Sequence, residues 1–444
     1  MAFCKYLFVL AIITKASLAA ECHGSPDPNA KENTFPIKDA DMKLVAKVKN
    51  GKLFTVGDAN TALKVVHVWG SPYEMGYAHG SLLKTEAASF MNAVWDYMED
   101  QVVQGINGTG IWKFHEWFLK DVANLGVEVA LDLEILVTSK YTGDYFLEEI
   151  KGLADACEVD YKKIQRIHML GELTKGSCSM MGAWGDAVAD PIKVLQFRAL
   201  DWDTDGPFKD YPQLTVYHPS TNGTGPGGMK ANAFVNIGFT GWLGSITGMS
   251  SAQMAISEIG ASFPDETFGK ESRFGIPFTY ILRDILQFDY TLDDAINRLA
   301  NARRTCDLIF GVGDGKEDRG FRGVQYSASV SNFYDDQNLK PEADWHPKIK
   351  DVVYWGMDWL CPGYNKKVAE RINANYGKLS PEIAVRDIMA RAQTGSVHSA
   401  VYDLTQSQLY VGFARAKGQD GPTYAYQRGF IKLDANMLFN EPMP

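Results

Sequence analysis

The spacing of apolar residues changes close to residue 178, and this change limits the folds that the chain can adopt. Before it, apolar residues recur three and four positions apart over 72–103, which predicts a helix. Helical patterns continue over 113–139 and 144–158. The last of these places Cys157 on its apolar stripe, so we expect that side chain in the core.

After that point, short runs of β-branched and aromatic residues alternate with turn residues. The runs are KVLQFRAL, QLTVYHP, AFVNIGF, QMAISEI, CDLIFGVG, HSAVYDL and QLYVGFA. The last two flank a short connection over 405–407, which predicts a β-hairpin. Helical patterns return at 276–303 and 380–393. A helical first third is therefore expected to precede a mixed β and α remainder.

Composition and charge argue against a nucleic-acid partner and against a stable membrane span. The chain has 444 residues, of which 45% are hydrophobic, so it can bury a large core. Its net charge of −10 argues against a nucleic-acid partner, which normally requires a basic face. Beyond the N-terminus, no stretch is long and apolar enough for a stable membrane span.

The N-terminus carries the pattern of a secretory signal peptide. MAFCKYLFVLAIITKASLAA combines a lysine, an apolar run and small residues at a cleavage site, which predicts a signal peptide over 1–20, with a membrane anchor as the alternative. Acceptor motifs for N-glycosylation at Asn107 and Asn222 fit this route. We therefore expect a secreted or lysosomal protein. The polar residues 21–45 are expected to form an unpacked lead-in.

The cysteine count predicts a thiol outside any disulfide. Without the signal peptide five cysteines remain, which are Cys22, Cys157, Cys178, Cys306 and Cys361. In an oxidising compartment an odd number leaves at least one free thiol or a bond between chains. Two intramolecular disulfides and one free cysteine is the simplest expectation, with the pairing left open. No cluster of cysteine and histidine has zinc spacing, so neither a metal nor another cofactor is expected.

Cys178 and two charged residues after it form a candidate catalytic set. Gly176 and Ser177 give a small, flexible approach to Cys178. Arg198 and Asp201 follow in FRALDWD, where a strand end or a bulge is needed to bring both toward one site. An arginine near a thiol favours the thiolate, and a carboxylate can orient a base, so the set suits acyl transfer. The alternative is a buried structural cysteine and an ion pair at a strand end.

Two further groups of residues could contribute to such a site. His398 could pair with Cys178 in the manner of papain, although a histidine at a strand start more often has a structural role. Aromatic side chains near the motifs could line an apolar acyl pocket or form ordinary core. These aromatic residues are Trp184, Trp202, Phe239 and Trp242.

Several longer motifs follow one another over residues 65–415. They are SPYEMGYAHG, FLEEIKGLADACEVD, GSCSMMGAWGD, FRALDWD, GWLGSITGMSSAQMAISE and HSAVYDLTQSQLYVGFA. In this order they resemble the acyl-coenzyme A:isopenicillin N acyltransferase-like group of N-terminal nucleophile hydrolases. FRALDWD resembles the Arg-x-x-Asp strand also seen in acid ceramidase and bile salt hydrolase relatives. The resemblance is nearest to the secreted, acid-ceramidase-like branch.

The resemblance implies an α+β fold in which two stacked β-sheets lie between helical layers, with a mainly helical N-terminal segment. It also implies that the precursor cuts itself between Ser177 and Cys178. Residues 21–177 would then form a helical chain and residues 178–444 a catalytic chain, and the two would stay associated as one folded unit.

The implied activity is that of a cysteine amidohydrolase. Cys178 would attack the amide carbonyl of a small N-acyl or lipid-like substrate and form a thioester, with its new α-amino group as the base. By resemblance, Asp201 would orient that amine and Arg198 would hold the thiolate or the substrate carbonyl. An acyltransferase on the same site and a non-catalytic secreted glycoprotein with this fold remain alternatives.

One position departs from the family pattern. The family places an asparagine, whose amide donates to the oxyanion, where this chain has Asp307 in RRTCDLIFGVGDG. An ionised aspartate cannot donate a hydrogen bond, so three alternatives stay open: Asp307 is protonated, a backbone N–H replaces it, or the alignment at this position is wrong. Cys306 beside it is a candidate for half of a disulfide.

Overall fold

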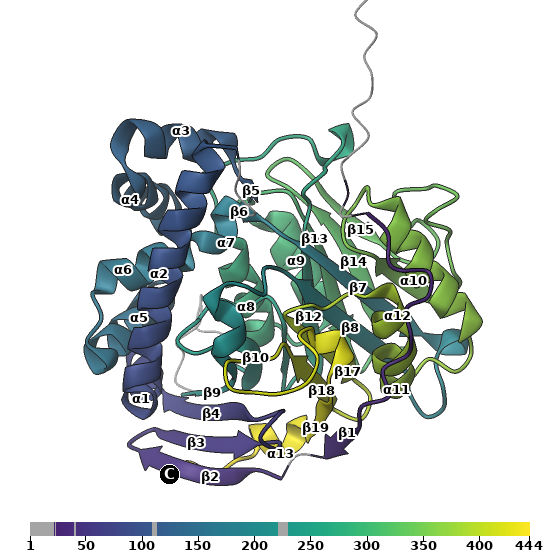
Figure 1. The fold of residues 1–444 in the computed structure, drawn as a ribbon, viewed down its shortest axis with the longest axis horizontal. Helices are drawn as coiled ribbons and strands as arrows, with labels where there is room; N and C mark the ends of the chain where they lie inside the picture. The colour runs from purple at the N-terminus through teal and green to yellow at the C-terminus, as the bar shows by residue number, and fades with distance from the viewer. Residues whose placement is uncertain (1–21, 23, 40, 109–112, 221–229) are drawn as a thin grey trace, which may run out of the picture.

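The computed structural model describes residues 22, 24–39, 41–108, 113–220 and 230–444. In this part of the chain two large β-sheets pack against each other, and helices cover their outer faces (Figure 1). The expected α+β class, with two stacked sheets between helical layers, is confirmed. The predicted signal peptide and Asn222 lie outside the described residues, whereas Asn107 is exposed at the end of α2 (Lys84–Ile106).

The smaller of the two large sheets carries the cysteine that the sequence singles out. Its order is β1 (Ile37–Asp39), β19 (Phe430–Asp434), β18 (Gln408–Phe413), β17 (His398–Asp403), β8 (Val194–Asp201), β7 (Ser177–Trp184) and β16 (Val352–Trp355). Neighbouring strands are antiparallel except for β1 and β19. We call it the seven-stranded sheet.

The larger sheet, called the ten-stranded sheet below, mixes early and late parts of the chain. Its order is β15 (Ser331–Tyr334), β14 (Phe321–Tyr326), β13 (Leu308–Asp314), β12 (Met254–Gly260), β11 (Gly248–Ser250), β10 (Phe234–Phe239), β9 (Pro212–Pro219), β4 (Leu63–Gly70), β3 (Gly51–Val56) and β2 (Lys43–Val48). The parallel pair β4–β9 joins strands from the two sides of residue 178.

Strand β7 lies at the interface between the two sheets, where it contacts β12, β13 and β14. All eight residues of β7 are buried. On the outer face of the ten-stranded sheet, α8 (Phe278–Phe288) packs on β11 and β12, and α9 (Leu292–Asn301) packs on β13. The seven-stranded sheet is covered by α10 (Pro362–Ala374), α11 (Pro381–Ile383), a π-helical turn (Ala384–Met389) and α12 (Ala390–Ala392). A last helix, α13 (Ala435–Phe439), follows β19.

The N-terminal helices gather at one side of the sheets (Figure 1), and the first of them packs on β2, β3 and β4. They are α1 (Pro72–Leu82), α2, α3 (Glu116–Leu125), α4 (Val127–Ser139), α5 (Asp144–Cys157), α6 (Tyr161–His168) and α7 (Leu170–Leu173). β5 (Lys113–Phe114), which directly precedes α3, pairs with β6 (Thr174–Lys175), which directly precedes the approach to Cys178. The helices predicted over 72–103 and 144–158 are therefore present, the first of them as α1 and α2.

Helices α1 and α5 pack closely because each has a glycine at the contact. A β-carbon at Gly76 would lie 2.0 Å from the carbonyl oxygen of Glu149, and one at Gly152 would lie 2.1 Å from that of Tyr73. Such distances exclude any side chain larger than hydrogen. The glycine in SPYEMGYAHG is thus required by helix packing, and Cys157 is buried at the end of α5 as predicted.

The prediction of an unpacked lead-in over 21–45 is wrong. Strand β1 extends the seven-stranded sheet, and β2 forms an edge of the ten-stranded sheet. Asn33 is buried, and its side-chain amide donates to the carbonyl oxygens of Tyr426 and Arg428. Strands β1–β4 also show that the first third is less helical than expected.

The expectation of two disulfides is also wrong. One disulfide, Cys22–Cys361, is formed among the described residues, and Cys157, Cys178 and Cys306 are thiols. Cys157 is held in the packed contact between α1 and α5, close to Gly80. The Cys306 thiol instead faces the Glu172 carboxylate at 3.7 Å. Each lies in its own buried environment, so neither is a disulfide partner for the other.

Candidate active site around Cys178

Cys178 is the second residue of β7 and has only 1% of its surface exposed. The pairing of β7 with β8 sets Cys178 opposite Leu200 and Met180 opposite Arg198. Opposed residues of antiparallel strands project to the same face, as do residues two apart along a strand. Cys178 and Arg198 therefore share a face, and Arg198 Nη2 donates to the Cys178 sulfur at 3.2 Å.

The Arg198 guanidinium is fully buried and links the two sheets. Its Nη2 also donates to Glu258 Oε2 at 3.0 Å, and its Nε donates to the Glu258 carbonyl at 3.2 Å. Glu258 lies on β12, so the ion pair crosses from one sheet to the other. Sequence reasoning missed Glu258 as a site residue. The available signal was a single charged residue inside the apolar strand MAISEIG.

The surroundings of the Cys178 thiol in the intact chain favour its protonated form. Burial raises the pKa of Cys178, and the nearby carboxylates of Glu258 and Asp201 add to this effect, while Arg198 opposes it. The sequence suggested that a nearby arginine lowers the pKa of this thiol. Arg198 does so, but the loss of solvent around the buried sulfur raises the pKa by more.

Asp201 ends β8 and lies opposite Ser177, the residue before Cys178. Its Oδ2 accepts from Thr394 Oγ1 at 2.5 Å, and its Oδ1 accepts from the amides of Gly395 and Ser396 at 2.8 and 2.9 Å. Burial raises the pKa of Asp201 to about 6, against the effect of these donors. The strand end that the sequence required is thus present, and it sets Asp201 beside the peptide bond that precedes Cys178.

The chain on the N-terminal side of Cys178 is held against β12. A β-carbon at Gly260 would lie 2.7 Å from the amide nitrogen of Gly176, so only glycine permits this approach. Ser262 Oγ donates to the carbonyl oxygen of Gly176 at 3.1 Å. The small residues before Cys178 therefore serve a close backbone contact at the expected cleavage point.

A small cavity of ≈ 50 Å³ adjoins the sulfur. Its apolar walls come from Leu200, Trp202, Trp242, Ile246 and Phe278. Two of the three tryptophans proposed for an acyl pocket thus lie beside Cys178. Trp184 does not, because it is at the other end of β7, where Arg319 lies over its ring at 5.9 Å. Phe239 packs beside this region, against Phe208 and His398.

Asp307 and His398, two other candidates from the sequence, lie outside the group formed by Cys178, Arg198 and Asp201. Asp307 is buried just before β13, with its carbonyl oxygen accepting from Ala261 N at 3.2 Å, and it does not line the cavity. His398 Nε2 lies 3.2 Å from Arg198 Nη1 and 3.0 Å from Thr247 Oγ1. Burial, together with Arg198, holds the pKa of His398 well below its usual value. The guanidinium contacts both His398 and Cys178, so a papain-like pair is not formed here.

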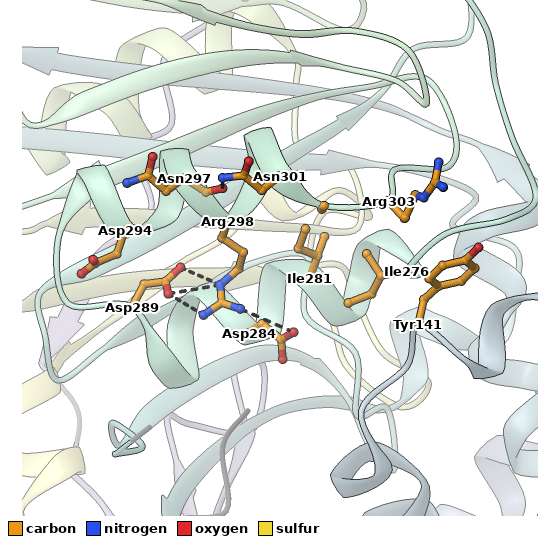
Figure 2. A pocket seen from close by; sticks show the side chains of 11 residues that line it. Tyr141, Ile276, Ile281, Asp284, Asp289, Asp294, Asn297, Arg298, Asn301 and Arg303 are labelled. Carbon is orange, nitrogen blue, oxygen red and sulfur yellow. Dashed lines mark hydrogen bonds and ion pairs between the residues drawn. The ribbon is translucent and has the colours of Figure 1, made fainter. Parts of the chain in front are cut away.

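A larger cavity of ≈ 470 Å³ lies elsewhere, along α8 and α9 (Figure 2). Two of its buried carboxylates are paired. Arg298 pairs with Asp289 through Nε and Nη2, with Nε 2.8 Å from Asp289 Oδ2, and Tyr145 donates to Asp284. None of the described residues that line it is a cysteine or a histidine. We therefore assign the candidate chemistry to the smaller cavity at Cys178.

No model of a known protein family matches this chain. Protein dcd1A of Dictyostelium discoideum is 32% identical over 459 residues, which cover 99% of this chain and 99% of that protein. Protein dcd1B of the same organism is 32% identical over 422 residues, covering 92% of this chain and 81% of that protein.

Among solved structures, the Caenorhabditis elegans ortholog of N-acylethanolamine-hydrolyzing acid amidase has 14% identity and a TM-score of 0.37, covering 51% of this chain and 93% of its own. Penicillin V acylase from Agrobacterium tumefaciens has 13% identity and a TM-score of 0.38, and the match covers 60% of this chain and 89% of the acylase. Within the described residues, no helix has the length and apolar character needed to cross a membrane.

Proposed function

The chain belongs to the family of the Dictyostelium discoideum proteins dcd1A and dcd1B, and from its Cys178 site we propose that it is a self-processing cysteine amidohydrolase. The observation that carries this proposal is the 3.2 Å contact between Arg198 Nη2 and the Cys178 sulfur, with Asp201 paired opposite Ser177. A thiol, a fixed cation and a carboxylate at one peptide bond are the groups that nucleophilic acyl transfer requires.

The first reaction is cleavage of the chain itself. The Cys178 sulfur attacks the carbonyl carbon of Ser177, a carbon–sulfur bond forms, and the Ser177–Cys178 carbon–nitrogen bond breaks. The thiol proton passes to the released nitrogen. Water then hydrolyses the thioester, which leaves a carboxylate on Ser177, a regenerated thiol and a new α-amino group on Cys178.

The new α-amino group then acts as the base for substrate turnover. Such a group titrates at about 7.7–8.0, so it can take the thiol proton and pass it to the leaving amine near neutral pH. Asp201 orients the amine, because its carboxylate is fixed by Thr394, Gly395 and Ser396. Arg198 holds the thiolate or the substrate carbonyl. Hydrolysis of the acyl-enzyme by water completes the cycle.

The substrate is an N-acyl amide with an apolar acyl group. The aromatic and aliphatic walls beside Cys178 support this class, because an apolar chain gains free energy when it leaves water for such a surface. We further propose a secreted or lysosomal location from the signal pattern over 1–20. Asp307 is proposed as the oxyanion residue only through its alignment with the family asparagine.

The experiment that tests the function begins with the intact mass of the reduced protein, made through the secretory route. The wild type should give two fragments, of which the second starts at Cys178, and Cys178→Ala should give one uncut chain. Cys157→Ala is the matched control, because this other buried thiol lies at the end of α5, outside the site. An uncut wild type would favour a non-catalytic glycoprotein.

Activity is then measured on a panel of N-acyl amides between about pH 4 and 8. Release of free acid supports the hydrolase, and Cys178→Ala should abolish it. Added amines separate the alternative, because an acyltransferase would convert them to new amides at the expense of the acid. Hydrolysis that persists in Cys178→Ala would remove Cys178 as the nucleophile.

A further inference from the structure

Trp242 forms one wall of the cavity at Cys178, and the backbone that carries it is unusually well fixed. It stands on the turn 239–245, which begins at the last residue of β10. Within the turn, the amide of Trp242 donates to the carbonyl of Phe239 at 3.0 Å. Side chains from four different elements bind other amide and carbonyl groups of the turn, at Gly241, Leu243 and Gly244, so the position of the indole is determined by the surrounding structure.

Two histidines of the N-terminal segment accept hydrogen bonds from this turn. His168, at the end of α6, accepts from the amide of Leu243 through Nε2 at 2.9 Å. His79, in α1, accepts from the amide of Gly241 through Nε2 at 3.1 Å. Both histidines are 1% exposed. A buried amide that lost such an acceptor would be left without a partner, which is costly.

Carbonyl oxygens of the turn are also bound by side chains. Arg283 Nη1 donates to the carbonyl of Leu243 at 3.0 Å, and Asn236 Nδ2 donates to that of Gly244 at 3.1 Å. Arg283 is itself fixed by Glu149, whose Oε2 accepts from Nη2 at 2.5 Å. The peptide of Leu243 is thus bonded on both sides, by His168 at its nitrogen and by Arg283 at its oxygen.

His168 also contacts the indole directly. Its ring stacks on that of Trp242, with centroids 5.2 Å apart and planes inclined by 21°. Its Nδ1 donates to the carbonyl of Ile164 at 2.8 Å, which leaves Nε2 as the acceptor for Leu243 and requires the neutral ring. Burial and the charge of Arg283 hold the pKa of His168 at about 4, which agrees with that form.

We propose that His168 is a positioning residue that sets the acyl-chain selectivity of the site, by holding the Leu243 amide and stacking on Trp242. The inference rests on the proposed function, whose substrate class it narrows to chains that fit against a fixed indole. His168 precedes the cleavage point and Trp242 follows it, so the selecting wall is built from both processed chains.

Two substitutions separate the contributions of the His168 ring. His168→Phe keeps a ring that can stack but removes the acceptor, and His168→Gln keeps an acceptor near the Nε2 position but removes the ring. The probes are 7-amino-4-methylcoumarin amides of butyric and lauric acid. We expect His168→Phe to change the ratio of kcat/KM between lauroyl and butyryl probes roughly tenfold, mainly through the KM of the lauroyl probe. His168→Gln should lie closer to the wild type.

A matched control is His346→Gln. His346 is equally buried and contacts two carbonyl oxygens, those of Pro341 and Tyr354, but it does not line the cavity. This variant should keep the wild-type ratio of kcat/KM even where its melting temperature falls. A folded His168→Phe with the wild-type ratio would overturn the inference. If His168→Phe does not fold, Trp242→Leu decides in its place, and an unchanged ratio again overturns it.

A second readout does not require turnover. Iodoacetamides with butyl and dodecyl chains label the Cys178 thiol, and intact mass gives the rate for each chain in the wild type and in His168→Phe. A shifted chain preference in the variant supports the positioning role, and an unshifted preference contradicts it. If the wild type hydrolyses neither coumarin amide while His168→Phe still shifts the labelling preference, the proposed function is rejected and the role of His168 in shaping the pocket is retained.

Discussion

Cys22 and Cys361 form a disulfide between residues 339 positions apart, and the bond joins the two sides of the peptide that precedes Cys178. Self-cleavage should therefore give two chains that remain covalently linked. We predict one band on a denaturing gel without reductant and two bands with it.

The control for this prediction is Cys22→Ser, which should give two bands without reductant. The two fragments should still elute together on a sizing column under native conditions, because β4 pairs with β9 and β1 pairs with β19. Two bands from the wild type without reductant would contradict the disulfide.

Gly260 permits the backbone of Gly176 to approach β12, so Gly260→Ala should impair cleavage. The added β-carbon would meet the Gly176 amide nitrogen at 2.7 Å and displace the segment that carries Ser177. A displacement of about 1 Å at a reacting bond can cost about 10²-fold in rate. We expect cleavage to slow by that order, measured as a time course of fragment formation after synthesis.

Gly238→Ala is the matched control for this prediction. Gly238 lies in β10, and a β-carbon there meets nothing within 4 Å. It should process at the wild-type rate. Equal rates for the two alanine variants would show that the contact with Gly176 is unimportant for cleavage.

Glu258 neutralises the buried guanidinium of Arg198, so Glu258→Gln should destabilise the fold. An unpaired buried charge typically costs about 3–5 kcal/mol. We expect a loss of that order in the free energy of unfolding, measured by denaturant titration in a Cys178→Ala background that stays uncut. Glu266→Gln, at an exposed glutamate, should change it little. An equal effect of both variants would contradict the pairing across the sheets.

The sequence predicted the elements of the second part of the chain better than those of the first. The runs from KVLQFRAL to QLYVGFA all contain strands, because alternating β-branched and aromatic residues there face a buried interface. β2 was missed since its residues are exposed or half-buried, so LVAKV carries little apolar contrast. β1 was missed because three residues at a sheet edge carry almost no pattern.

The candidate site was predictable only where its members are close in sequence or share a motif. Cys178, Arg198 and Asp201 lie on two paired neighbouring strands, so order and spacing brought them together. Glu258 reaches Arg198 from the other sheet, and His168 reaches the turn of Trp242 from a helix. Those contacts depend on how layers pack, which periodicity along one element does not report.

A substitution at Asp307 tests whether this residue occupies the oxyanion position of the family asparagine. A carboxylate in the oxyanion site repels the developing charge, whereas an amide donates to it, and one such donor is worth about 10²–10³ in rate. Asp307→Asn should therefore raise kcat on N-acyl amides toward that range, while Asp307→Ala should not. An Asp307→Asn enzyme with the wild-type kcat would remove this residue from the oxyanion site.

Asp201 should make the stability of the uncut chain depend on pH in a defined direction. Burial raises its pKa to about 6, above the ordinary value of 3.8, so between these values the folded state binds more protons than the unfolded state. Stability from this group is therefore present at low pH and is lost as the pH rises through about 6. Asp201→Asn has no carboxyl to titrate. In the Cys178→Ala background, its free energy of unfolding should rise relative to Asp201 by on the order of 1–3 kcal/mol between about pH 4 and 7. Other titrating groups contribute equally to both proteins and cancel when the two free energies of unfolding are subtracted. A difference between Asp201→Asn and Asp201 that stays constant or falls as the pH rises would contradict the buried carboxylate.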